Sequence, residues 1–146
     1  MRRIVLPLLL LLLAACGSTS GSRPADVAKP SISINQAGPL YFASSNSATV
    51  SIDVGIRNNA SVPLRVREIE LRSPGMMQYQ LVRRSKIFNE TLAPGESRTL
   101  GVVTTATKYV SRPTAEPLAI QAIVRFEVNG RGFREIVMDN FAGSGE

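Results

Sequence analysis

The stretch that decides the fold is Leu118-Ala119-Ile120-Gln121-Ala122-Ile123-Val124-Arg125-Phe126-Glu127-Val128, followed directly by Asn129-Gly130. Apolar side chains recur at every second position from Leu118 to Val128, which is the period of a strand with one buried face. Asn-Gly is a preferred pair for a two-residue hairpin turn, because both residues tolerate a positive φ. We therefore predict a hairpin whose second strand runs from about residue 131 to residue 140.

The region around residue 67 interrupts a second alternating pattern. Leu64 and Val66 fall on one face of a predicted strand, whereas Ile69 and Leu71 fall on the other face. One extra residue near Arg67-Glu68 would bring all four apolar side chains to a single buried face. The sequence therefore predicts a β-bulge at this point.

Shorter alternating segments occupy much of the remaining chain. Strands are predicted around Ser31–Asn35, Leu40–Ala43, Val50 to Ile56, Tyr79 to Leu81, and Leu100 to Val102. No stretch between Pro30 and Phe141 has a helical period of useful length. About seven or eight short strands at this spacing predict an all-β, antiparallel sandwich, with a small barrel as the alternative.

This strand pattern resembles the broad immunoglobulin-like class of β-sandwiches. The chain lacks the buried tryptophan and the cysteine pair of true immunoglobulin domains. The resemblance therefore implies the architecture alone.

The first sixteen residues have the organisation of a bacterial lipoprotein signal. Arg2 and Arg3 precede an apolar run, Ile4 to Leu13, which is shorter than the roughly 20 residues of a membrane-spanning helix. The tetrapeptide Leu13-Ala14-Ala15-Cys16 resembles the bacterial lipobox. This resemblance implies cleavage before Cys16 and attachment of diacylglycerol to its sulfur, often with a further acyl chain on the new amine. Several acyl chains on one residue give stable anchoring.

The chain divides into four predicted segments: a signal peptide at residues 1–15, the lipidated Cys16 with a flexible tether at residues 16–29, a β-sandwich at residues 30–141, and a flexible tail at residues 142–146. The tether prediction rests on its Gly, Ser and Ala content. Gly17 stands where aspartate retains lipoproteins at the inner membrane in Gram-negative sorting. By that resemblance we expect the outer membrane, facing the periplasm, as the destination.

Charge and residue content limit the possible chemistry. Removal of Arg2 and Arg3 leaves fifteen basic residues against eleven acidic ones, a net charge of +4 that suits an anionic partner or an ordinary solvated surface. The chain has no histidine, and Cys16 is its only cysteine. An internal disulfide, a Ser-His-Asp or Cys-His pair and a thiolate or imidazole zinc site are therefore excluded. We expect no metal, no catalytic residues and no cofactor apart from the covalent lipid.

Arg83, Arg84 and Lys86 form the densest basic cluster, close in sequence to Tyr79. We predict that these four residues form a surface-binding site in a loop, because clustered cations can meet phosphates or an oppositely charged partner. The alternative is a charged strand end that prevents edge-to-edge pairing.

Glu68 and Glu70 are two residues apart, so both side chains should project from the same face of a strand. Paired carboxylates can serve as acid and base on glycosidic bonds. The alternative is simple charge pairing with the flanking Arg65, Arg67 and Arg72.

The sequence thus predicts a lipid-anchored, periplasm-facing binding or scaffold module of the bacterial cell envelope, without enzymatic activity. Its expected partners are the membrane, through the lipid, and an envelope protein; no nucleic acid is expected. One alternative rests on Val50 to Asn59 with Pro63-Leu64, a stretch similar to the water-stress domain of bacterial late-embryogenesis-type lipoproteins. That family's Asn-Pro-Asn turn is interrupted here by Ala60 and Ser61, and the similarity implies an envelope or desiccation stress protein. The other alternative is an accessory factor or enzyme that acts on the envelope.

Anchoring should depend on the sulfur of Cys16. Cys16→Ser should abolish acylation and leave the precursor uncleaved or mis-sorted, because the thioether cannot form. Incorporation of radiolabelled palmitate measures this directly, and label entering the Ser variant would contradict the prediction.

Overall fold

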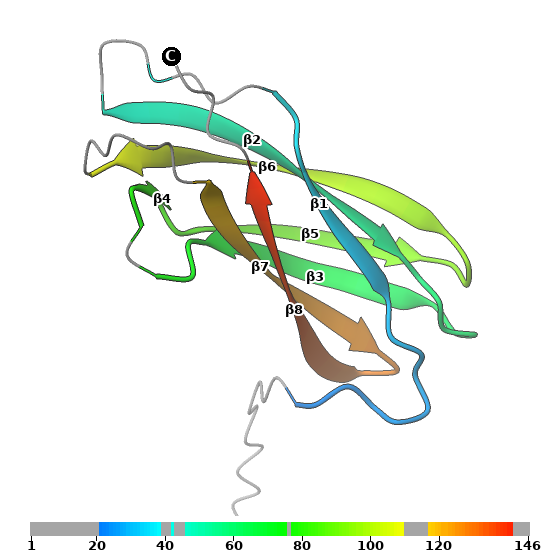
Figure 1. The fold of residues 1–146 in the computed structure, drawn as a ribbon. Helices are drawn as coiled ribbons and strands as arrows, with labels where there is room; N and C mark the ends of the chain where they lie inside the picture. The colour runs from blue at the N-terminus through cyan, green and yellow to red at the C-terminus, as the bar shows by residue number, and fades with distance from the viewer. Residues whose placement is uncertain (1–20, 39–41, 43–45, 76, 110–116, 142–146) are drawn as a thin grey trace, which may run out of the picture.

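The computed structural model describes residues 21–38, 42, 46–75, 77–109 and 117–141. These residues form two four-stranded antiparallel sheets packed face to face (Figure 1). The strands are β1 Ser31–Gln36, β2 Ser47–Arg57, β3 Leu64–Arg72, β4 Tyr79–Leu81, β5 Arg84–Leu92, β6 Ser97–Lys108, β7 Leu118–Val128 and β8 Arg131–Phe141. The all-β sandwich prediction is confirmed, and the barrel alternative is not the fold.

The strand order has immunoglobulin-type connectivity. Sheet I has the order β1-β2-β6-β4, and sheet II has the order β5-β3-β7-β8. With β1, β2 and β6 taken as strands A, B and E, and β3, β7 and β8 as strands C, F and G, each set shares one sheet as in that class. The chain changes sheets between β4 and β5, where the Val82 amide donates to the Thr105 carbonyl over 2.7 Å.

The β7–β8 hairpin supplies the centre of the core. The inward side chains of β7 are all buried, and Phe126 stacks on Phe133 of β8 with ring centroids 5.2 Å apart. Each large apolar side chain buried in this way contributes about 1.5–3 kcal/mol to stability. Asn129 and Gly130 have φ values of 49° and 75°, so the predicted positive-φ turn joins the two strands.

A register shift between Val66 and Glu68 confirms the predicted bulge in β3, on both its β5 and its β7 side. Arg67 is the extra residue, and it is exposed. Leu64, Val66, Ile69 and Leu71 are consequently all buried in the core.

Some sequence predictions about strands need correction. Strand β5 was not predicted, because its exposed sequence Arg-Ser-Lys-Ile-Phe-Asn-Glu-Thr-Leu lacks a sustained alternation of apolar and polar residues. Of the predicted strand Leu40–Ala43, only Phe42 is among the described residues, and Phe42 is not in a strand. The signal peptide, Cys16 and the tail at residues 142–146 lie outside the described residues.

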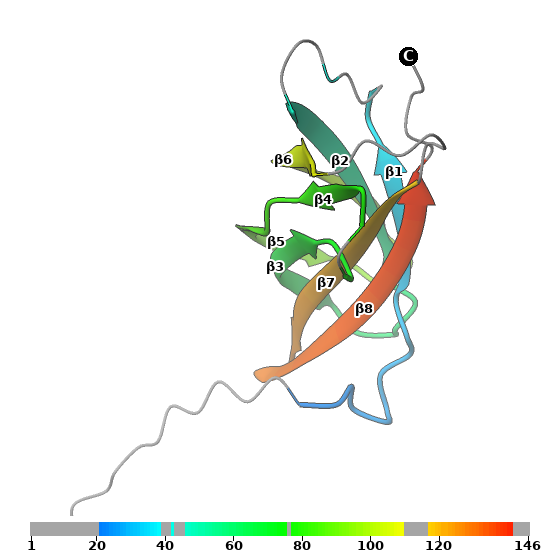
Figure 2. The same ribbon diagram turned by 60° about the vertical axis from the view of Figure 1, so that its left-hand side comes forward.

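The segment at residues 21–29, here called the N-terminal strap, packs against β8, although the sequence assigned it to a flexible tether (Figure 2). Gly21 forms a parallel β-bridge with Phe133, and Arg23 Nε lies 3.2 Å from Glu135 Oε1. Val27 is 2% exposed and belongs to the core. The packed domain therefore begins before Pro30. Val27, which belongs to no repeating apolar pattern, joins this segment to the core.

Buried Asn58 links the loop between β2 and β3 to the loop between β5 and β6. Its side-chain amide donates to the carbonyls of Val62 and Leu92, over 2.9 and 3.0 Å. Its backbone carbonyl accepts from the Gly95 amide over 2.8 Å. Asn58 therefore fixes the corner that follows β2.

The strap should contribute measurably to stability. Val27→Ala removes two buried methyl groups and should lower the free energy of unfolding by about 1–2 kcal/mol in urea titrations. The matched control is Ala28→Ser, because Ala28 is exposed and the change should have little effect. If Val27→Ala were as stable as the unaltered chain, residues 21–29 would be better described as part of the flexible tether.

Candidate binding surfaces

The structure does not bring the four predicted binding residues together. Tyr79 lies in β4, is 6% exposed, and stacks on the Phe42 ring with centroids 5.1 Å apart. Arg83 lies between β4 and β5, with its Nε 2.8 Å from Glu70 Oε1. Tyr79 is therefore a packing residue, and Arg83 serves an ion pair within the domain.

Arg84 and Lys86 lie in edge strand β5, and not in a loop. Lys86 Nζ donates to the Gly101 carbonyl of β6 over 2.9 Å and lies 4.9 Å from the centroid of the Phe88 ring. Lys86 thus links edge strand β5 of sheet II to β6 of sheet I. A lysine in this place also discourages pairing with another strand, so the arrangement favours the edge-protection alternative.

Glu68 and Glu70 do project from the same face of β3, the outer face of sheet II. Their partners are not the flanking arginines, because Arg65 and Arg67 pair with Glu127, and Arg72 donates to Gln121. Arg125 of β7 joins the two glutamates instead, with contacts of 3.1 Å to Glu68 and 3.2 Å to Glu70. The sequence prediction therefore missed the cross-strand partner of the two glutamates, which the bulged register brings to them.

Glu70 is an unusual residue for an outer face, because it is only 1% exposed. Burial raises the pKa of its carboxyl, but hydrogen bonding and charge from Arg83 and Arg125 outweigh burial, so the pKa lies below its usual range. A lowered pKa is the opposite of what a general acid needs at neutral pH. The geometry therefore favours a structural ion-pair cluster over an acid–base pair.

The outer face of sheet I has a different character. Most of its outward positions carry a short hydroxyl side chain, and these residues define the hydroxyl face: Ser31, Ser33, Ser47, Thr49, Ser51, Ser97, Thr99, Thr105 and Thr107. The register pairs Ser47 with Thr107 and Thr49 with Thr105 across β2 and β6. Nearer the other end of the face, the hydroxyl residues of β1 and β6 flank Arg57 and Gly55 of β2. Sheet II, in contrast, presents the Arg and Glu side chains described above. The sandwich therefore has one nearly uncharged broad face and one charged broad face.

A shallow hollow of about 310 Å³ lies at one end of the hydroxyl face. Gly55 is among its lining residues, in register between Ser33 and Thr99. A Cβ atom at residue 55 would lie 2.6 Å from Ser33 Oγ, so only glycine fits there without displacing that hydroxyl. Arg57 and Arg98 also line the hollow.

The two arginines of the hollow differ in their partners. Arg98 is held by Glu90 and Glu96 at 2.5 and 2.6 Å. Arg57 is exposed and has no ion-pair partner among the described residues. The hollow therefore offers hydroxyl groups and one available guanidinium.

The described ranges contain no group of three or more side chains that could hold a metal ion. They also contain no helix that is long and apolar enough to cross a membrane.

No protein-family model matches the chain, and no curated protein sequence matches it. Solved structures do share its fold. The protein described as ApaA from Bordetella pertussis is 18% identical, with a TM-score of 0.57 over 83% of this chain and 98% of that one. The Northeast Structural Genomics Consortium target SoR45 is 10% identical, with a TM-score of 0.55 over 80% of this chain and 87% of that one. At these identities the similarity establishes the fold alone.

Glu70 should stabilise the domain in a pH-dependent way. Glu70→Ala should lower the free energy of unfolding by about 1–3 kcal/mol at neutral pH, because Arg125 loses a buried partner. A carboxyl with a lowered folded pKa stabilises above its unfolded pKa, and this contribution disappears as pH falls through the folded value. The difference from the unaltered chain should therefore shrink below about pH 4.

Chemical denaturation at several pH values measures this effect. Glu127→Gln is the matched control, since Glu127 is a more exposed carboxylate that also binds two arginines, and its loss should cost less than about 1 kcal/mol. A Glu70 effect no larger than the Glu127 effect would contradict the structural role.

Proposed function

We propose that this chain is a lipid-anchored, non-enzymatic binding or scaffold module of the bacterial cell envelope, facing the periplasm from the outer membrane. The lipobox-like tetrapeptide ending at Cys16 supports the anchor. The domain after it is a sandwich that buries its apolar residues and leaves a broad, nearly uncharged face exposed.

The observation that carries the binding role is the hydroxyl face. The cores of protein interfaces contain few charged residues. The hydroxyl face likewise carries fewer charged residues than the outer face of sheet II. Hydroxyl groups both donate and accept hydrogen bonds, so they can match the polar groups of many partner surfaces. Two outward positions of this face are glycines, Gly55 and Gly101, and the side chains of Ser33 and Asp53 lie over them. The partner that fits is an envelope protein with a neutral, hydrogen-bonding surface.

A photo-crosslinking residue at Thr49 tests this proposal in intact envelopes. Thr49 is exposed on the hydroxyl face, and Ser85 is an exposed hydroxyl residue of β5 in the opposite sheet. We expect a discrete adduct from Thr49 and none of the same mass from Ser85.

Charge inserted into the face should remove the adduct. Ser51→Arg should reduce it at least about tenfold, because an unpaired charge at an interface core is costly. Thr91→Arg places the same charge on exposed β5 and should leave the adduct unchanged. Equal adducts from Thr49 and Ser85, or insensitivity to Ser51→Arg, would exclude the hydroxyl face as the docking surface.

A further inference from the structure

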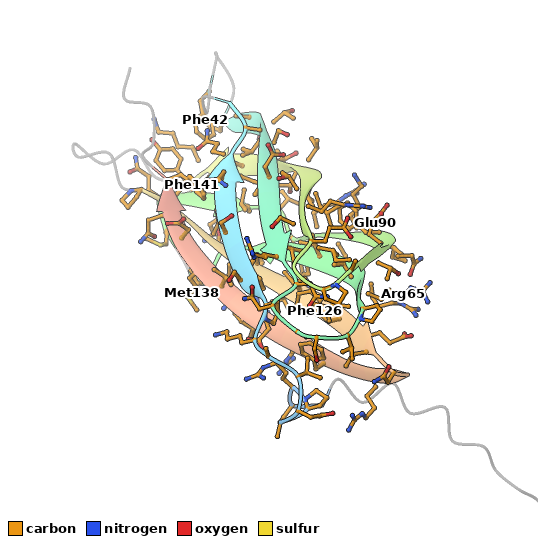
Figure 3. The ribbon with its side chains drawn as sticks, turned by 90° about the vertical axis from the view of Figure 1, so that its right-hand side faces the viewer. Phe42, Arg65, Glu90, Phe126, Met138 and Phe141 are labelled. Carbon is orange, nitrogen blue, oxygen red and sulfur yellow. The ribbon has the colours of Figure 1, made fainter. Side chains whose placement is uncertain are left out.

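The strap brings the proposed lipid anchor to one particular end of the sandwich. Gly21 bridges Phe133, the third residue of β8, and Arg131 Nη2 lies 3.4 Å from Asp26 Oδ2 of the strap. The same end holds the β7–β8 turn, since Val128 and Arg131 are register partners. Figure 3 shows Arg65 at this end of the sandwich and Phe42 and Phe141 at the opposite end. We call the end with Arg65 and the strap the anchor end.

Chain length limits how far the anchor end can stand from the membrane. Five peptide steps separate Cys16 from Gly21. A fully extended chain covers at most about 3.3–3.6 Å per residue, so these steps span no more than about 18 Å in any conformation. The tether expected from sequence alone, residues 16–29, would have allowed a far greater separation.

The anchor end carries an excess of positive charge. Its basic residues outnumber its acidic ones, eight to five: Arg23, Lys29, Arg57, Arg65, Arg67, Arg98, Arg131 and Arg134 against Asp26, Glu90, Glu96, Glu127 and Glu135. Glu127 is shared by two arginines, and Glu135 is shared by Arg23 and Lys29. The acidic residues are too few to neutralise the basic ones, so this end carries a net positive charge.

Arg134 is the most available of these cations. It is exposed, and its register partner across the β7–β8 pair is another cation, Arg125. Arg125 is already engaged with Glu68 and Glu70. Arg134 has no ion-pair partner among the described residues, so it can bind an external anion.

We propose that the anchor end lies on the membrane and binds the phosphates of anionic phospholipid headgroups, which fixes the orientation of the sandwich. This inference rests on the lipid anchor of the proposed function. Charge complementarity supports it, because each basic residue close to an anionic leaflet raises the bound population roughly fivefold. In this orientation the end that carries Phe42 and Phe141 points away from the membrane, and the hydroxyl face remains open to a partner.

The test uses the lipidated protein reconstituted in vesicles of phosphatidylcholine alone or of phosphatidylcholine with phosphatidylglycerol. Flotation first reports attachment to each vesicle. Hydrogen–deuterium exchange then reports contact: amides of the strap and of residues 131–135 should exchange severalfold more slowly on the anionic vesicles than on the neutral ones. High salt should remove the difference, because it screens the charges.

Charge reversal locates the contact. The double variant Arg131→Glu with Arg134→Glu should abolish the slower exchange on anionic vesicles. The control Arg84→Glu with Lys86→Glu changes charge equally in edge strand β5 and should keep it.

The experiment distinguishes failure of the lipid anchor from failure of the proposed orientation on the membrane. A chain that floats with neither vesicle lacks the anchor, which overturns the proposed function. A chain that floats with both but exchanges identically on them overturns the orientation alone, as does slower exchange that the β5 control also loses.

Discussion

The bulge at Arg67 is the constraint on which the two faces of this sandwich depend. Side chains alternate along a regular strand, so if Arg67 were accommodated without a bulge, Glu68 and Glu70 would share the phase of Leu64 and Val66 and enter the core. The shift sends both carboxylates outward, where Arg125 and Arg83 reach them. It also returns Ile69 and Leu71 to the interior. The bulged conformation at Arg67 therefore preserves both the core and the charged outer face of sheet II.

Periodicity made much of this fold predictable. The long alternating stretch of β7, the Asn129-Gly130 turn and the phase break around Arg67 each carry a local signal that the structure confirms. Strand β5 carries no such signal, because an edge strand with an exposed surface does not need a continuous apolar face. The strap was missed for a related reason: Val27 is a single buried residue in a Gly- and Ser-containing segment, and one residue has no period.

The binding surface was harder to predict than the fold. Clustering in sequence suggested Arg83, Arg84 and Lys86, but successive residues of an extended chain point in different directions and meet different partners. The hydroxyl face has the opposite property: its members are scattered over three strands and meet only through the sheet register. The signal was present as Ser and Thr at the outward positions of β2, but only pairing with β6 turns that row into a surface.

The strap also has a mechanical consequence. If the chain links a membrane to a partner on sheet I, any pull between them enters the domain through residues 21–29. The first contacts to carry the load are the Gly21–Phe133 bridge and the Arg23–Glu135 pair, both outside the main hydrogen-bonded ladders. Peeling these contacts releases up to about 3.3–3.6 Å of chain per residue before either sheet is strained. Under such a load the strap would detach before the sandwich unfolds, because fewer contacts hold it.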